Sequence, residues 1–174
     1  MDVGDQVSDF ELQDETGTPR RLSTLLRDGP VVLFFYPVAS SGGCTREACH
    51  FRDLAAEFAA LGARPVGISG DTVSAQSRFA TAHSLGYPLL SDAGRQVARE
   101  FGARRSWLPG GLQTKRRTFV IGSDRRILAV VSGETRFDRH ADEALAALRE
   151  HRAAGGPGAG AVPRPTTPSS TAGP

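Results

Sequence analysis

Hydrophobic positions along the chain follow two spacings, one typical of strands and the other typical of helices. Residues 31–36 form a continuous β-branched and aromatic run between two prolines. Such a run predicts a central strand that is covered on both faces. From Cys44 to Leu61, apolar side chains recur at three- and four-residue intervals. This spacing predicts one amphipathic helix, which Gly62 ends.

The rest of the chain alternates in the same way. Further strands are expected at 65–69, 88–90, 118–121 and 127–131, and further helices at 73–84, 94–101 and from Asp138 onward. They are preceded by a short hairpin over 9–12 and 20–22 and by one helical turn at 24–27. Ser23 is expected to cap this turn, and Asp138 is expected to cap the last helix. The pattern predicts an α/β fold, in which helices flank a mixed central sheet that opens with an N-terminal β-hairpin.

The length of 174 residues fits one globular domain. We expect this domain to span 1–152. Residues 153–174 are mostly Gly, Pro, Ala, Ser and Thr. Because such a segment buries too little apolar surface to offset its ordering entropy, it is predicted to be a disordered C-terminal tail.

Charge and hydropathy exclude several kinds of partner. Lys and Arg number 21 against 19 Asp and Glu, which leaves a net charge of +2 and no strong field for nucleic acid or a membrane surface. No apolar run approaches the roughly 18 residues of a membrane span, and residues 1–5 lack a signal pattern. A cytoplasmic protein is expected. Thiols stay reduced there, so two cysteines favour redox or metal chemistry over a structural disulfide.

Cys44 follows the loop that connects the predicted central strand to the next predicted helix. Unpaired N–H groups and the helix dipole stabilise an anion at such a position, and the thiolate is the reactive form of cysteine. Gly42 and Gly43 are expected to let the backbone approach a substrate closely. Ser41 offers a hydroxyl to the helix, to the sulfur or to a bound oxygen, and Pro37 stiffens one wall of the site.

Cys49 follows five residues later on the same predicted helix. In an ideal helix it lies about 140° around the axis from Cys44, with Cα atoms roughly 8–9 Å apart. A disulfide needs Cα atoms within about 7 Å, so the two thiols pair only if the helix unwinds. Cys44 falls on the apolar stripe and Cys49 on the more polar face, which suits an attacking and a resolving thiol.

The motif Pro37-x-x-x-Ser41-x-x-Cys44 resembles the signature of peroxiredoxins. The stretch Gly43-Cys44-Thr45-x-Glu47-x-Cys49-x-Phe51-Arg52-Asp53 is similar to that of the Q-type, bacterioferritin-comigratory subgroup of the AhpC/TSA family. Matching segments extend over roughly residues 4–150, and the resemblance implies a thioredoxin-like fold. Gly42 stands where the subgroup usually has proline, which implies a less rigid loop and easier unwinding. Ser41 replaces the commoner threonine.

The resemblance also assigns roles to residues. It implies that Cys44 is the peroxidatic cysteine and Cys49 the resolving one. The family's active-site arginine stands three residues before a strand phenylalanine, which gives Arg116 here. Arg117 is the competing candidate, but strand alternation turns it to the other side. The implied reaction is reduction of a hydroperoxide by a monomer, with thioredoxin as reductant and no metal or organic cofactor.

Other interpretations remain open at this level. Cys49 can be an ordinary helix residue in a peroxidase that relies on an external thiol, and oxidation of Cys44 can signal to a partner as a redox sensor. The spacing of disulfide oxidoreductases is absent. Cys44, Cys49 and His50 do not match the usual ligand pattern of a zinc site. Glu47 is interpreted as a first-turn carboxylate that offsets the helix dipole.

Overall fold

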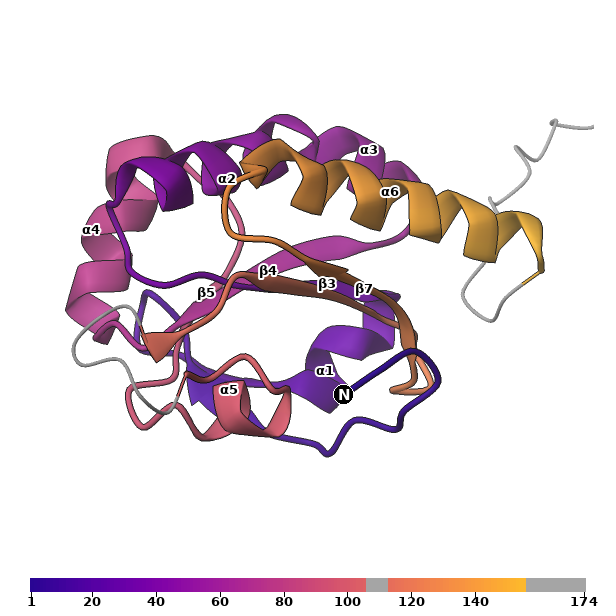
Figure 1. Ribbon diagram of the computed structural model, residues 1–174, viewed down its shortest axis with the longest axis horizontal. Helices are drawn as coiled ribbons and strands as arrows, with labels where there is room; N and C mark the ends of the chain where they lie inside the picture. Colours follow the sequence, from indigo (N-terminus) through magenta and orange to yellow (C-terminus); the bar gives the residue numbers. More distant parts are fainter. Residues whose placement is uncertain (106–112, 156–174) are drawn as a thin grey trace, which may run out of the picture.

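A seven-stranded sheet lies at the centre of the computed structural model, which describes residues 1–105 and 113–155 (Figure 1). Its strands are β1 (Glu11–Gln13), β2 (Pro19–Arg21), β3 (Val31–Phe35), β4 (Arg64–Ser69), β5 (Leu89–Ser91), β6 (Arg117–Ile121) and β7 (Ile127–Ser132). Their order across the sheet is β2-β1-β5-β4-β3-β6-β7. β4 pairs in parallel with β3 and β5, and the other neighbours pair antiparallel. The predicted mixed sheet and N-terminal hairpin are confirmed.

Helices cover both faces of this sheet. They are α1 (Leu22–Leu25), the 3-10 turn η1 (Leu26–Asp28), α2 (Gly42–Asp53), α3 (Ala55–Ala60), α4 (Val73–His83), α5 (Gln96–Glu100) and α6 (Phe137–Ala153). Figure 1 shows α2, α3, α4 and α6 on one side of the sheet and α1 and α5 on the other. The expected α/β architecture is therefore confirmed.

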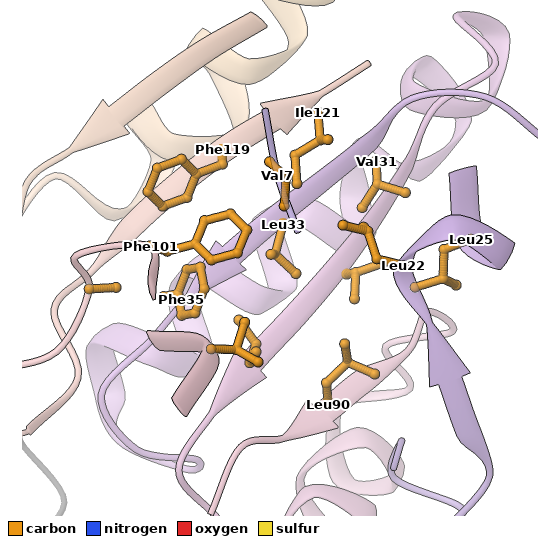
Figure 2. Packing of buried hydrophobic residues seen from close by; sticks show 14 of the residues in the cluster. Val7, Leu22, Leu25, Val31, Leu33, Phe35, Leu90, Phe101, Phe119 and Ile121 are labelled. Atoms are coloured by element: carbon orange, nitrogen blue, oxygen red, sulfur yellow. The ribbon is translucent and has the colours of Figure 1, made fainter. Parts of the chain in front are cut away.

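β3 faces two hydrophobic cores, as its unbroken apolar run predicts. Val31, Leu33 and Phe35 point into the core beneath α1 and α5, where Figure 2 shows Phe35 beside Phe101 and Phe119. Val32 and Phe34 point into the core beneath α2 and α6. All five residues of β3 are buried. The strand is thus fixed from both sides.

The predicted single helix from 44 to 61 is wrong at its start and in its middle. α2 begins at Gly42 because the Ser41 side chain caps it there. The helix is then interrupted at Leu54, whose backbone has φ −94° and ψ 9°, outside the helical region. The chain continues as the short helix α3.

The two predicted caps are also wrong. Ser23 lies inside α1, where its backbone N–H and its hydroxyl donate to Asp9 at 2.9 and 2.8 Å. A carboxylate from earlier in the chain therefore satisfies this helix start. Asp138 lies in the first turn of α6, after the N-cap residue Arg136, and its carboxylate accepts hydrogen bonds from Arg46.

The end of the described chain is helical. α6 runs to Ala153, one residue beyond the expected domain boundary, and the described residues end at Gly155. The rest of the predicted tail, 156–174, lies outside the described residues, and so does Trp107. Among the residues that are described, no helix has the length and apolar character needed to cross a membrane.

We predict that Gly67→Ala destabilises the protein. A Cβ atom at Gly67 would lie 2.6 Å from Leu89 Cδ2 and 3.0 Å from Phe34 Cζ, both in the core. Overpacking of this kind costs about 1–3 kcal/mol in the free energy of unfolding, which denaturant titration measures. Gly94→Ala is the control, since its nearest neighbour would be Gln96 Cγ at 3.7 Å. Equal losses in the two variants would contradict the prediction.

Candidate active site

The loop after β3 is held in place before α2 begins. Pro37 is buried at the end of the strand. The backbone N–H of Ala39 donates to Asp71 Oδ2 at 2.8 Å, which ties the loop to the segment after β4. Ser40 follows with φ 66°, a left-handed conformation that is uncommon for serine. The chain thus turns sharply before the helix that carries both cysteines.

Ser41 is the N-cap of α2. Its Oγ accepts a hydrogen bond from the Cys44 N–H at 3.3 Å, and its carbonyl accepts from Thr45 N at 2.8 Å. The remaining N–H groups of the first turn belong to Gly42 and Gly43, which have no partner within a helix. Cys44 therefore lies at the positive end of the helix dipole.

The two cysteines differ in exposure. Cys44 is 1% exposed, whereas Cys49 is partly exposed on the same helix. Both thiols are free. Because α2 is continuous from Gly42 to Asp53, the separation of about 8–9 Å between Cα atoms expected for an ideal helix applies, and the folded helix keeps the thiols apart.

Arg116 reaches Cys44 from the neighbouring strand. Arg117 pairs with Phe35 in the register of β6 and β3, so Arg116 stands beside the end of β3 where the loop to α2 begins. Its Nη2 donates to Cys44 Sγ at 3.3 Å, and its side chain is almost fully buried. Arg117 instead donates to the carbonyl of Phe101 at 3.2 Å, on the far side of the sheet. Of the two candidates, Arg116 is the one beside the thiol.

Glu47 lies on the other side of the same guanidinium. Its side chain is fully buried, and its Oε2 accepts a hydrogen bond from Arg116 Nη1. Burial raises the pKa of this carboxyl to about 8, although the nearby Arg116 acts in the opposite direction. The interpretation of Glu47 as a first-turn carboxylate that offsets the helix dipole is therefore wrong, because α2 begins at Gly42 and has no acidic residue in its first turn. The i, i+3 spacing from Cys44 was the available signal, because it places both side chains on one helix face.

Phe137, the first residue of α6, covers this cluster. The centre of its ring lies 4.8 Å from Arg116 Cζ, a cation–π contact. A Cβ atom at Gly43 would come within 2.6 Å of the same ring. Gly43 therefore makes room for Phe137, whereas nothing lies within 4 Å of a Cβ at Gly42. Both glycines were expected to let the backbone approach a substrate. At Gly43 the group that approaches closely is the Phe137 ring instead.

A buried histidine completes the surroundings of Glu47. His140 of α6 contacts Thr118 Oγ1 through Nδ1 and the Gly133 carbonyl through Nε2, both at 2.9 Å. Its Nδ1 lies 3.8 Å from Glu47 Oε1. Burial lowers the pKa of His140. Sequence reasoning missed His140 and Phe137 because tertiary packing brings α6 to the site and no local pattern signals it.

An ion pair and a hydrogen bond join the outer side of α2 to α6. Arg46 Nε donates to Asp138 Oδ1 at 3.0 Å, and His50 Nε2 lies 2.8 Å from Asp142 Oδ1. The His50 ring is thus hydrogen-bonded to a carboxylate on the neighbouring helix. Across 1–105 and 113–155, no group of three or more His, Cys, Asp or Glu side chains is placed to hold a metal ion.

Comparison with known proteins identifies the family of the chain. A sequence profile of the AhpC/TSA family matches residues 3–130. The chain belongs to the AhpC/TSA family. Peroxiredoxins are thiol peroxidases, and membership supports that activity for this peroxiredoxin.

Relatives of this peroxiredoxin include Q-type proteins. A chloroplastic peroxiredoxin Q from Sedum lineare is 37% identical over 143 residues, covering 80% of this chain and 74% of the relative. The structure of peroxidoxin BcpB from Mycobacterium tuberculosis has a TM-score of 0.83 and 59% identity, covering 86% of this chain and 97% of that one. Bacterioferritin comigratory protein from Xanthomonas campestris has a TM-score of 0.74 and 28% identity, covering 82% and 91%. The predicted family and thioredoxin-like fold are confirmed.

The raised pKa of Glu47 predicts that Glu47→Gln changes how stability depends on pH. The folded protein holds a proton on Glu47 that the unfolded chain releases near the usual pKa of 4.5. The resulting contribution to stability is fully present below that pH and is lost as pH rises through about 8. The free energy of unfolding of the wild type, measured relative to Glu47→Gln, should therefore fall between about pH 5 and pH 8.5.

The control for this measurement is Glu57→Gln, which removes an exposed carboxylate from α3. Its stability relative to the wild type should show no comparable fall over the same range. A difference between wild type and Glu47→Gln that stays constant or grows with pH would show that Glu47 is already ionised in the folded protein.

Proposed function

We propose that this chain is a thiol-dependent peroxidase that reduces hydrogen peroxide and organic hydroperoxides through Cys44. The observation that carries the proposal is the buried Arg116 guanidinium 3.3 Å from Cys44 Sγ, at the N-terminus of α2. A permanent cation and a helix dipole at one sulfur both favour its thiolate form. The structure reported for the Xanthomonas campestris protein describes alkyl peroxide reduction, which agrees with this substrate class.

In the first step, the Cys44 thiolate attacks the terminal oxygen of the hydroperoxide. A sulfur–oxygen bond forms as the oxygen–oxygen bond breaks, and the sulfur supplies two electrons. The leaving oxygen takes a proton and departs as water or an alcohol, while Cys44 becomes a sulfenic acid. Arg116 Nε is buried and has no hydrogen-bond partner among the described residues, so it is available to donate to the peroxide. Ser41 Oγ and Pro37 line the site at the same end of the helix.

In the second step, Cys49 resolves the sulfenic acid. The Cys49 sulfur attacks the Cys44 sulfur, an intramolecular disulfide forms, and the hydroxyl group leaves with the Cys49 proton as water. The start of α2 must unwind for this to happen. Unwinding breaks the Ser41 cap and pulls Arg46 away from Asp138, whereas Tyr87, which donates to the Ala48 carbonyl at 2.7 Å, anchors the helix further along.

An external dithiol then returns the enzyme to its reduced state. We assign this role to thioredoxin or a similar reductant, which exchanges its own thiols with the Cys44–Cys49 disulfide in the cytoplasm. The proposed cycle uses a monomer and requires no metal or organic cofactor, because the redox chemistry takes place on sulfur.

We predict that Cys44→Ser and Cys49→Ser fail at different steps. Cys44→Ser should lose peroxidase activity, because its hydroxyl is a poor nucleophile in place of the thiolate. Cys49→Ser should react once and stop at a sulfenic or over-oxidised Cys44. The measurements are NADPH consumption with peroxide, thioredoxin and its reductase, and intact mass after one addition of peroxide.

Each outcome of this experiment bears on the proposal. Full thioredoxin-linked turnover by Cys49→Ser would show that an external thiol resolves Cys44. A single stoichiometric oxidation of the wild type without turnover would point to a peroxide sensor. Unchanged activity in Cys44→Ser would remove the basis of the proposed mechanism.

We also predict that Gly42→Pro slows formation of the disulfide. Gly42 is the first residue of α2, where proline is well tolerated, and Ser41 has φ −74° and ψ 151°, which suit a residue before proline. A stiffer start should stabilise the folded helix by about 0.4–1 kcal/mol and slow resolution about two- to fivefold. Rapid-quench mass spectrometry should therefore find more over-oxidised Cys44 at a given peroxide concentration.

Gly42→Ala is the graded control, since a Cβ there meets nothing within 4 Å. It should fall between the wild type and Gly42→Pro. Disulfide formation in Gly42→Pro at the wild-type rate would show that unwinding of this turn does not limit resolution.

A further inference from the structure

One buried cation serves two buried acids in this site. Arg116 Nη2 donates to Cys44 Sγ at 3.3 Å, while Nη1 of the same guanidinium donates to Glu47 Oε2. Cys44 and Glu47 are 1% and 0% exposed. Within the described part of the chain, Arg116 is the cation that hydrogen-bonds to either acid. If both acids were ionised, the cluster would carry one uncompensated negative charge away from water.

The neighbouring groups do not supply the missing positive charge. His140 Nε2 faces the Gly133 carbonyl, which only accepts hydrogen bonds, so the ring carries its proton there. Burial lowers the pKa of His140, which favours a neutral imidazole whose Nδ1 accepts from the Thr118 hydroxyl. The negative charge of Glu134, on the segment before α6, raises the pKa of Glu47 further. Tyr87 donates its hydroxyl hydrogen to the Ala48 carbonyl and brings no cation.

The second oxygen of Glu47 is also without a partner. Oε1 is buried and accepts no hydrogen bond from any described residue, and His140 Nδ1 lies 3.8 Å from it. A buried carboxylate is normally stabilised at both oxygens, and leaving one bare is costly. Protonation removes the negative charge and so lowers this cost. Burial raises the pKa of Glu47 to about 8, in agreement with a neutral carboxyl.

We propose that Cys44 and Glu47 share one proton, which lies on Glu47 while Cys44 is a thiolate and is released when Cys44 becomes a sulfenic acid. Arg116 is the cation that both groups share, so it pairs with one anion at a time. Glu47 is a positioning residue here, because it acts on the thiol through the guanidinium. The inference rests on the proposed peroxidase function and adds the source of a proton that the first step needs.

The chemistry of that step balances within the site. The thiolate forms a sulfur–oxygen bond, the oxygen–oxygen bond breaks, and the leaving oxygen carries a negative charge. The proton from Glu47 neutralises this oxygen, giving water or an alcohol. Cys44 is now an uncharged sulfenic acid, and the Glu47 carboxylate replaces the thiolate as the anion paired with Arg116. The net charge of the cluster is the same before and after reaction.

The test counts the protons exchanged with solvent during one oxidation. The protein carries Cys49→Ser, so the reaction stops at the sulfenic acid, and hydrogen peroxide is added at neutral pH in weak buffer containing a pH indicator. With Glu47 present, no net proton should be taken up for each sulfenic acid formed. With Glu47→Gln added, one proton should be taken up, because glutamine has none to give. Glu57→Gln, at an exposed site, should behave like the parent.

The possible outcomes separate this inference from the proposed function. Uptake of one proton in both proteins, or of none in both, overturns proton sharing while leaving the peroxidase intact. No loss of the Cys44 thiol on peroxide addition overturns the proposed function itself. If Glu47→Gln fails to fold, infrared difference spectra of the parent decide the matter. Loss of a carboxylic acid carbonyl band on oxidation supports the inference, and an unchanged band overturns it.

Discussion

The contact between the Arg116 guanidinium and the Cys44 sulfur is the interaction on which the rest of the site depends. It requires a buried cation at the end of a central strand, and the fold supplies one because β6 runs antiparallel to β3 with Arg117 opposite Phe35. Burial strengthens the electrostatic pairing, but it also means that every other charge nearby must be balanced. Glu47, His140 and Phe137 are arranged around this single requirement.

Most of the fold could be predicted from the sequence because its signals are local. The apolar run at 31–36 reports a strand with two buried faces, and β3 does face two cores. The helix starts were predicted less well. Ser23 and Asp138 are common capping residues, but Asp9 and Arg46 bind them instead. Hydrogen bonds between distant segments decide such positions, and no local pattern shows them.

The site likewise contains residues that local sequence signals predict and residues that only tertiary packing brings together. Pro37, Ser41, Cys44 and Cys49 follow one another along one loop and helix. The resemblance to peroxiredoxins, whose active-site arginine precedes a strand phenylalanine by three residues, pointed to Arg116, which lies beside the thiol. The residues behind that arginine could not be found similarly. Phe137 and His140 come from α6, and their positions depend on how that helix packs against α2. Glu47 was visible but misinterpreted, because its burial depends on the same packing.

The close approach of Gly43 and Phe137 links two positions that lie far apart in the sequence. A side chain at 43 would occupy the space of the ring, and a smaller residue at 137 would uncover Arg116. Neither position can change freely while the other stays as it is. In related chains, a larger residue at the first position should accompany a smaller one at the second, together with another way of covering the guanidinium. The two positions should therefore vary as a pair.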